Sequence, residues 1–89
     1  IITDHHHVPY EMPDDAIAFL NPHRKDCPYP FKELSGAGVA LKLVMALARE
    51  YFSKEEYENY LRESIDIAAI GTVADCMQLV GENRTIVIE

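Results

Sequence analysis

An aspartate and two histidines, Asp4-His5-His6, directly follow an apolar, β-branched run at the start of the chain. Imidazole and carboxylate groups are the usual ligands of divalent transition metals. Residues 1–3 have the composition of a buried strand, and ligands of open α/β sheets bind where strands end. Because neighbouring residues point in different directions, we expect one histidine to ligate a metal ion and the other to face a substrate.

A fortuitous or engineered histidine run is the alternative interpretation of residues 4–7. An affinity tag usually contains about six or more histidines, and no strand leads into it. The sequence therefore favours a site. The spacing does not require His7, which we expect to be a solvent-exposed loop residue.

A second carboxylate, Asp75, ends the apolar segment Gly71-Thr72-Val73-Ala74. An unpaired carboxylate is costly to bury, so Asp75 needs a partner. A metal ion, an arginine or a helix end would each satisfy it. From the spacing alone, capping of a helix is somewhat favoured over metal ligation.

Two further segments have polar groups that could meet a phosphate. Ser35-Gly36-Ala37-Gly38 precedes a predicted helix, where free backbone N–H groups accept phosphate. Close packing of a buried helix explains these glycines equally well. Asn83-Arg84 could hold a carboxylate or a phosphate, although a solvated surface pair is slightly favoured.

The predicted elements alternate between short strands and apolar helices. Capping patterns begin two of the helices, at Ser35 and at Ser53-Lys54-Glu55-Glu56. The predicted elements are a buried strand over residues 1–3, a strand over 16–20, an irregular loop over 23–34, helices over about 36–52 and 53–62, and a second buried helix over 64–74. Residues 85–88 fit a strand or a helix equally well.

The composition is that of one small globular domain, with 89 residues, 48% apolar and 26% charged. The first residue is not Met, so the chain looks cut from a longer one. No signal peptide or membrane-spanning run is found, which predicts a cytoplasmic protein with reduced cysteines, Cys27 and Cys76. The net charge of −7 has the wrong sign for an autonomous nucleic-acid binder.

Several segments occur together in a specific order along the chain. They are Ile2-Thr3-Asp4-His5-His6, Asn21-Pro22, Tyr29-Pro30-Phe31, residues 34–40, Gly71-Thr72-Val73-Ala74-Asp75 and Gly81-Glu82-Asn83-Arg84. This ordered set resembles the RecJ-type branch of the DHH phosphoesterases. The resemblance implies an α/β fold, in which residues 1–89 form the C-terminal half of a parallel-sheet DHH catalytic domain, a helix-rich fragment with one or two short strands.

The resemblance also implies a function and residue roles. RecJ-type enzymes degrade single-stranded DNA from the 5′ end, with two Mn²⁺ or Mg²⁺ ions held by four motifs, of which this chain matches the third and fourth. His5 and Asp75 would ligate one ion, His6 would meet the scissile phosphate, and Asp4 would orient an imidazole. The residues expected near the substrate are His6, Ser35, Gly36, Gly38 and Arg84.

The two aspartates expected from the earlier motifs are absent, so we expect the fragment alone to be inactive. Its partner would be single-stranded DNA through the intact protein. The apolar helices also predict self-association, or contact with the remainder of the parent chain. The alternatives are a DHH phosphodiesterase acting on short oligoribonucleotides or cyclic dinucleotides, a non-catalytic scaffold, and an unrelated metal-binding domain.

Overall fold

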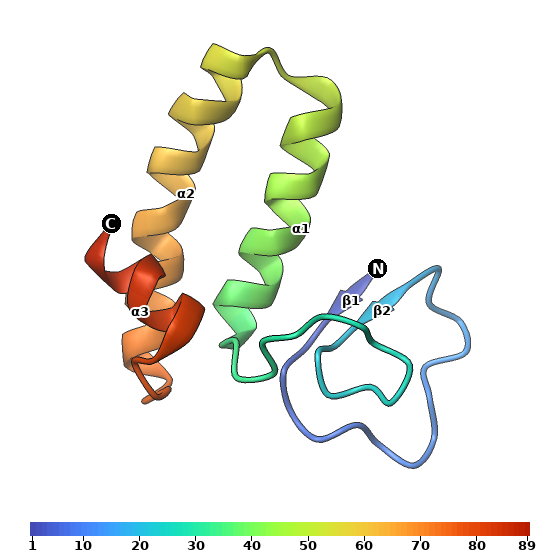
Figure 1. The fold of residues 1–89 in the computed structure, drawn as a ribbon. Helices are drawn as coiled ribbons and strands as arrows, with labels where there is room; N and C mark the ends of the chain where they lie inside the picture. The colour runs from blue at the N-terminus through green and yellow to red at the C-terminus, as the bar shows by residue number, and fades with distance from the viewer.

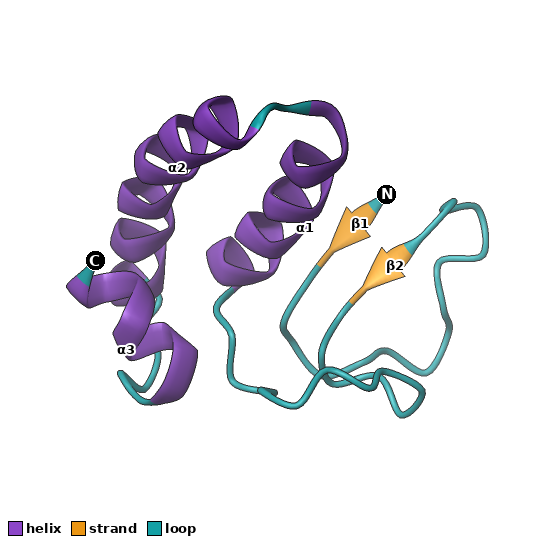
Figure 2. Ribbon diagram, turned by 45° about the horizontal axis from the view of Figure 1, so that its top comes forward, coloured by secondary structure: helices purple, strands orange, loops and turns teal.

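The computed structural model describes residues 1–89 and contains two short strands and three helices (Figure 1). The elements in chain order are β1 (Ile2–Thr3), β2 (Phe19–Leu20), α1 (Gly36–Tyr51), α2 (Lys54–Ala74) and α3 (Gly81–Ile88). The strands and their loops lie to one side of α1, and α2 and α3 lie to the other (Figure 2). This arrangement confirms the predicted helix-rich α/β fragment.

The two strands pair in parallel, with Ile2 opposite Phe19 and Thr3 opposite Leu20. Backbone hydrogen bonds of 2.9 Å from Ile2 N–H to Ala18 O and from Asp4 N–H to Leu20 O extend the pairing. Parallel strands end at the same edge of a sheet. The polar residues that follow β1 and β2 are therefore neighbours.

The prediction that residues 1–3 form a buried strand is wrong for this chain, because Ile1 is 65% and Ile2 40% exposed. In a sheet of only two strands each strand is an edge strand, so no further strand covers either outer edge. The second strand is also shorter than predicted. It is limited to Phe19–Leu20 within the predicted range 16–20.

The first helix begins as the sequence predicts. Ser35 is the N-cap of α1 and its hydroxyl accepts a hydrogen bond from the Gly38 N–H. α1 ends at Tyr51, and extended Phe52 leads directly to Ser53, the N-cap of α2. Ser53 and Glu56 form the complete predicted capping box, so α1 and α2 make a tight helical hairpin.

A single helix, α2, replaces the two helices predicted over 53–62 and 64–74. No proline or glycine lies between Arg62 and Ser64, so nothing interrupts the hydrogen-bond ladder there. The predicted break marked only a change from polar to apolar composition. Of the apolar segment 64–74, only Ala68 and Thr72 are buried, and Ile67 and Ile70 are more than 70% exposed.

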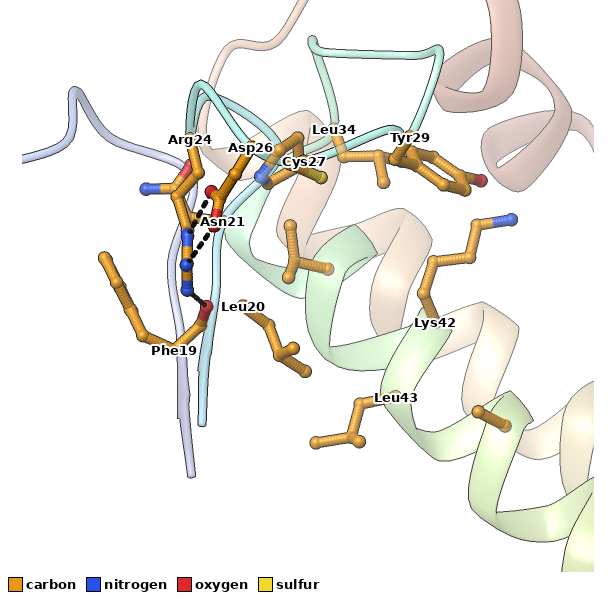
Figure 3. Close-up of a pocket in the computed structure, with 13 residues that line it drawn as sticks. Phe19, Leu20, Asn21, Arg24, Asp26, Cys27, Tyr29, Leu34, Lys42 and Leu43 are labelled. Atoms are coloured by element: carbon orange, nitrogen blue, oxygen red, sulfur yellow. Dashed lines mark hydrogen bonds and ion pairs between the residues drawn. The ribbon is translucent and has the colours of Figure 1, made fainter. Parts of the chain in front are cut away.

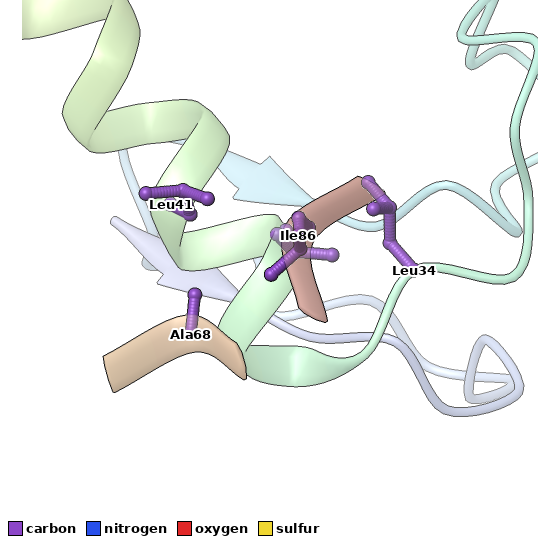
Figure 4. Close-up of a cluster of buried hydrophobic side chains, with 5 residues drawn as sticks. Leu34, Leu41, Ala68 and Ile86 are labelled. Atoms are coloured by element: carbon purple, nitrogen blue, oxygen red, sulfur yellow. The ribbon is translucent and has the colours of Figure 1, made fainter. Parts of the chain in front are cut away.

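The hydrophobic core lies where α1, α2 and α3 meet. It consists of Leu34, Val39, Leu41, Ala68 and Ile86. Figure 4 shows Leu41, Ala68 and Ile86 from the three helices directed toward one region. Ile86 settles the open question about the tail, since residues 85–88 belong to helix α3, which presents this side chain to the core.

The loop over residues 23–34 contains no helix or strand, as predicted. Tyr29 and Phe31 anchor it by packing against the core. The Tyr29 hydroxyl donates a 2.6 Å hydrogen bond to Glu82, which also forms an ion pair with Lys42. This contact joins the loop, α1 and α3.

Candidate functional site

His5 and Asp75 lie side by side although they come from opposite ends of the chain. The distance from His5 Nε2 to Asp75 Oδ2 is 3.2 Å, and the side chains are 15% and 45% exposed. The predicted proximity is confirmed. An imidazole nitrogen and a carboxylate oxygen therefore converge at a point that solvent reaches.

The elements on either side of this pair explain its position. His5 is the second residue after β1. Its ring rests on the first residue of α1, because a Cβ atom placed on Gly36 would lie 3.3 Å from His5 Cδ2. Asp75 is the C-cap residue of α2, and its backbone N–H bonds to Gly71 O. The carboxylate of Asp75 contacts His5. The backbone of Asp75 therefore caps α2, while its side chain belongs to the candidate site.

Asp4 holds the ring of His6, the residue predicted to meet the substrate. The distance from Asp4 Oδ1 to His6 Nδ1 is 2.7 Å, and the same oxygen accepts from the His5 N–H at 2.8 Å. Hydrogen bonding to His6 outweighs the opposing effect of burial and lowers the pKa of the Asp4 carboxyl. Asp4 therefore favours the ring orientation in which Nε2 of His6 faces outward.

The rings of His5 and His6 differ in direction, with centroids 4.4 Å apart and planes inclined by 56°. This agrees with the expectation that the two neighbouring side chains differ in direction, and their separate tasks stay a prediction. His7 is exposed, as expected for a loop histidine. The centroid of the His7 ring lies 6.0 Å from that of His23, which is in the loop after β2.

Asn21 is a positioning residue that the sequence analysis did not assign. It is 3% exposed. Its amide donates to the His6 carbonyl at 2.9 Å, and its Oδ1 accepts from the His23 N–H at 2.9 Å. Asn21 therefore ties the turn after β1 to the turn after β2. The only sequence signal for a role of Asn21 is that the Asn21-Pro22 segment belongs to the ordered set that carries the family resemblance.

The glycine-rich segment that begins α1 packs next to the site. Ser35 is fully buried, and its hydroxyl is engaged by the Gly38 N–H at 2.9 Å and by Thr72 Oγ1 at 2.7 Å. These contacts favour the packing interpretation for Ser35 and Gly38. Gly36 lies beside His5, and contact of these three residues with a substrate stays a prediction.

The interpretation of Asn83-Arg84 as a solvated surface pair is wrong for Asn83, which is fully buried. Its side-chain amide donates to Glu33 O at 2.6 Å and Gln78 O at 3.1 Å, holding the loop before α1 against α3. The residue pair Asn83-Arg84 alone does not predict this contact, because Glu33 lies 50 residues away in the sequence. Arg84 is exposed, and its role in substrate binding stays a prediction.

The residues present fit part of a metal site. His5 and Asp75 supply two donors of suitable chemistry for a divalent ion. No group of three or more His, Cys, Asp or Glu side chains is arranged to hold an ion. Neither Cys27 nor Cys76 forms a disulfide within this chain. A complete centre would need ligands that these 89 residues do not supply.

A cavity of about 560 Å³ lies elsewhere, between β2, the loop after it and α1. Figure 3 shows Leu20 and Leu43 directed into this cavity and Arg24 paired with Asp26 at its rim. Neither His5 nor Asp75 lines it. The candidate site is therefore an open junction of strand and helix ends.

Comparison with known proteins identifies relatives of almost the whole chain. Residues 1–72 match the family model described as DHH family, N-terminal domain. The single-stranded-DNA-specific exonuclease RecJ of Bacillus subtilis (strain 168) is 48% identical over 86 residues, which cover 97% of this chain and 10% of the relative. The proteins of the same name from Salmonella typhimurium (strain LT2) and Escherichia coli (strain K12) are 40% and 38% identical, and each match covers 94% of this chain and 15% of the relative.

This chain thus spans between a tenth and a sixth of the length of these relatives. No solved structure matches it. None of its helices combines the length and the apolar character needed to cross a membrane. The family match extends over most of the chain and includes Asp4, His5 and His6, and the chain therefore belongs to the DHH family.

Proposed function

We propose that this chain is part of a metal-dependent exonuclease that hydrolyses phosphodiester bonds of single-stranded DNA from the 5′ end. The observation that carries the proposal is the 3.2 Å approach of His5 Nε2 to Asp75 Oδ2. The relatives named single-stranded-DNA-specific exonuclease support the substrate. In this proposal, residues 1–89 contribute the third and fourth metal-binding motifs of a DHH catalytic domain.

Each residue of the site has a defined task in this proposal. His5 and Asp75 hold one divalent ion, either Mn²⁺ or Mg²⁺, through Nε2 and a carboxylate oxygen. Bound divalent ions would supply Lewis acidity and a water nucleophile. Asp4 holds Nδ1 of His6, so that Nε2 is free to meet a phosphate oxygen of the substrate. Gly36 leaves room for the His5 ring.

The remaining ligands, including a carboxylate that bridges two ions, belong to the rest of the protein in this proposal. The net charge of −7 is consistent with a chain that contributes carboxylates to cations. Basic and aromatic surfaces that bind the DNA strand would then lie in other domains. We further propose a cytoplasmic location and a role in DNA repair and recombination.

The test is a nuclease assay on the full-length protein. Single-stranded DNA labelled at the 5′ or the 3′ end is incubated with Mn²⁺ or with chelator. We expect metal-dependent release of nucleotides from the 5′ end, and loss of at least about 100-fold in rate for His5→Ala and Asp75→Ala. Degradation of oligoribonucleotides or cyclic dinucleotides alone would reject the proposed substrate.

A matched variant is available beside the site. His7 is an exposed loop histidine in the same turn, and His7→Ala should keep the activity of the wild type. The 89-residue chain by itself should show no nuclease activity. Full activity of His5→Ala in the intact protein, or metal-dependent degradation by the isolated chain, would contradict the assignment of this site.

A further inference from the structure

The residues beneath the His5–Asp75 pair form a buried chain of hydrogen bonds. Ser35 and Thr72 are both fully buried, and their side-chain oxygens lie 2.7 Å apart. Thr72 Oγ1 also donates to the Ala68 carbonyl at 2.8 Å, and Ser35 Oγ accepts from the Gly38 N–H at 2.9 Å. This chain of bonds connects the first turn of α1 with the last turn of α2.

Counting protons fixes the direction of the bonds. A hydroxyl has one proton to donate. Since Thr72 gives its proton to Ala68 O, the proton between the two oxygens comes from Ser35. Thr72 is then donor and acceptor at once, and every group in the chain is satisfied. Loss of either hydroxyl would leave a buried polar group without its partner.

The same contact lies next to both members of the candidate metal pair. Gly36 follows Ser35 and lies against the His5 ring, because a Cβ atom placed on Gly36 would lie 3.3 Å from His5 Cδ2. Thr72 precedes Asp75 by one helical turn. The helices also approach closely here, because a Cβ atom on Gly71 would lie 2.6 Å from Ala37 Cβ. A small shift between α1 and α2 would therefore change the separation of His5 and Asp75.

We propose that Ser35 and Thr72 are positioning residues whose hydrogen bond sets the separation of His5 and Asp75, and through it the affinity for the divalent ion. This inference rests on the proposed function, because it takes these two side chains as ligands of one ion. Both hydroxyls are fully buried, and in this proposal they act without touching the ion. Their effect passes through the relative placement of α1 and α2.

The test measures Mn²⁺ affinity of the full-length protein by electron paramagnetic resonance of the free ion. Thr72→Val has nearly the same shape but no hydroxyl, and it should weaken Mn²⁺ binding roughly tenfold. Thr72→Ser keeps the hydroxyl and should bind Mn²⁺ like the wild type. Thr85→Val is the matched control, since the Thr85 hydroxyl is exposed and bonds only within α3, to Gly81 O.

A second variant separates positioning from general loosening of the fold. Ile86→Val removes a methylene from the core without touching the hydrogen-bond chain, and it should lower stability without lowering Mn²⁺ affinity. Thr72→Val with wild-type affinity, or Ile86→Val with an equal loss of affinity, would overturn the inference. A wild-type protein that binds no Mn²⁺ would instead overturn the proposed function, and this inference with it.

Discussion

Asn21 holds the backbone of His6 through a 2.9 Å hydrogen bond from its side-chain amide to the His6 carbonyl. The other end of the same amide accepts from the His23 N–H. Both contacts are made by a side chain that is 3% exposed. The turn that carries His6 is thus fixed by the residue that follows the neighbouring strand β2, in addition to the contact of the His6 ring with Asp4.

Replacement of Asn21 by aspartate tests this relationship. Asp keeps an acceptor for the His23 N–H but cannot donate to the His6 carbonyl, and it places a negative charge against that oxygen. We expect stability to fall by about 1–3 kcal/mol and kcat of the full-length enzyme to fall, with Mn²⁺ affinity unchanged, because His5 and Asp75 are not displaced. Unchanged kcat would show that Asn21 does not position His6.

Asp4 should matter through its charge as well as its shape. Asp4→Asn keeps an oxygen that accepts from the backbone N–H of His5, but it removes the carboxylate that holds His6 Nδ1. We expect kcat/KM on single-stranded DNA to fall about tenfold or more, with little change in thermal unfolding. An Asp4→Asn enzyme with wild-type kcat/KM would show that His6 needs no such partner.

Glu82 should make the contact between α3 and the loop sensitive to acid. Burial raises the pKa of its carboxyl, but hydrogen bonds from Lys42 and Tyr29 outweigh burial, so the folded-state pKa is lowered. A lowered pKa contributes stability above the unfolded-state pKa, and this stability is lost as pH falls through the folded-state pKa. Acidification should therefore weaken this contact.

Glu82→Gln provides the corresponding measurement. Gln cannot ionise, so the variant should be less stable than the wild type at pH 7, by about 1 kcal/mol after allowance for partial exposure. The difference in Tm between the two should shrink as pH falls below the ordinary range of a glutamate. Glu63→Gln, at an exposed position of α2 without an ion pair, is the control. A Tm difference that stays constant with pH would contradict this account.

The exposed stripe of α2 predicts association of the isolated 89-residue chain. Ile67, Ile70 and Val73 are 72%, 71% and 53% exposed on one helix face. Sedimentation at micromolar concentration should show oligomers, and chelator should not dissociate them. Ile67→Lys should reduce association, whereas Tyr10→Lys, at a fully exposed loop position, should not. A stable monomer would contradict the prediction.

Local signals made part of this structure predictable. Ser35 and the Ser53–Glu56 capping box mark helix starts because cap hydrogen bonds span only a few residues. The break in α2 was wrongly predicted because composition changes there without a helix-breaking residue. The buried contacts of Asn21 and Asn83 depend on segments brought together by the fold, so no local pattern indicates them.

The candidate site also combines residues that local motifs indicate with residues that only the fold brings together. The resemblance carried by the ordered motifs predicts that His5 and Asp75 lie close together, and the 3.2 Å distance from His5 Nε2 to Asp75 Oδ2 confirms their proximity. The sequence does not predict the hydrogen bond between Ser35 and Thr72, because each residue is common near a helix end and neither indicates the other as its partner. Side chains with metal-binding chemistry are thus easier to identify from sequence than the uncharged residues that hold them in place.

The most direct test of the central claim is a crystal structure of the full-length protein grown with Mn²⁺, with anomalous diffraction recorded to locate the ion. We expect an anomalous peak within coordination distance, about 2.0–2.3 Å, of both His5 Nε2 and an Asp75 carboxylate oxygen. His5→Ala should lose that peak. Manganese bound elsewhere, with His5 and Asp75 still paired directly at their present distance, would contradict the claim that they share one ion.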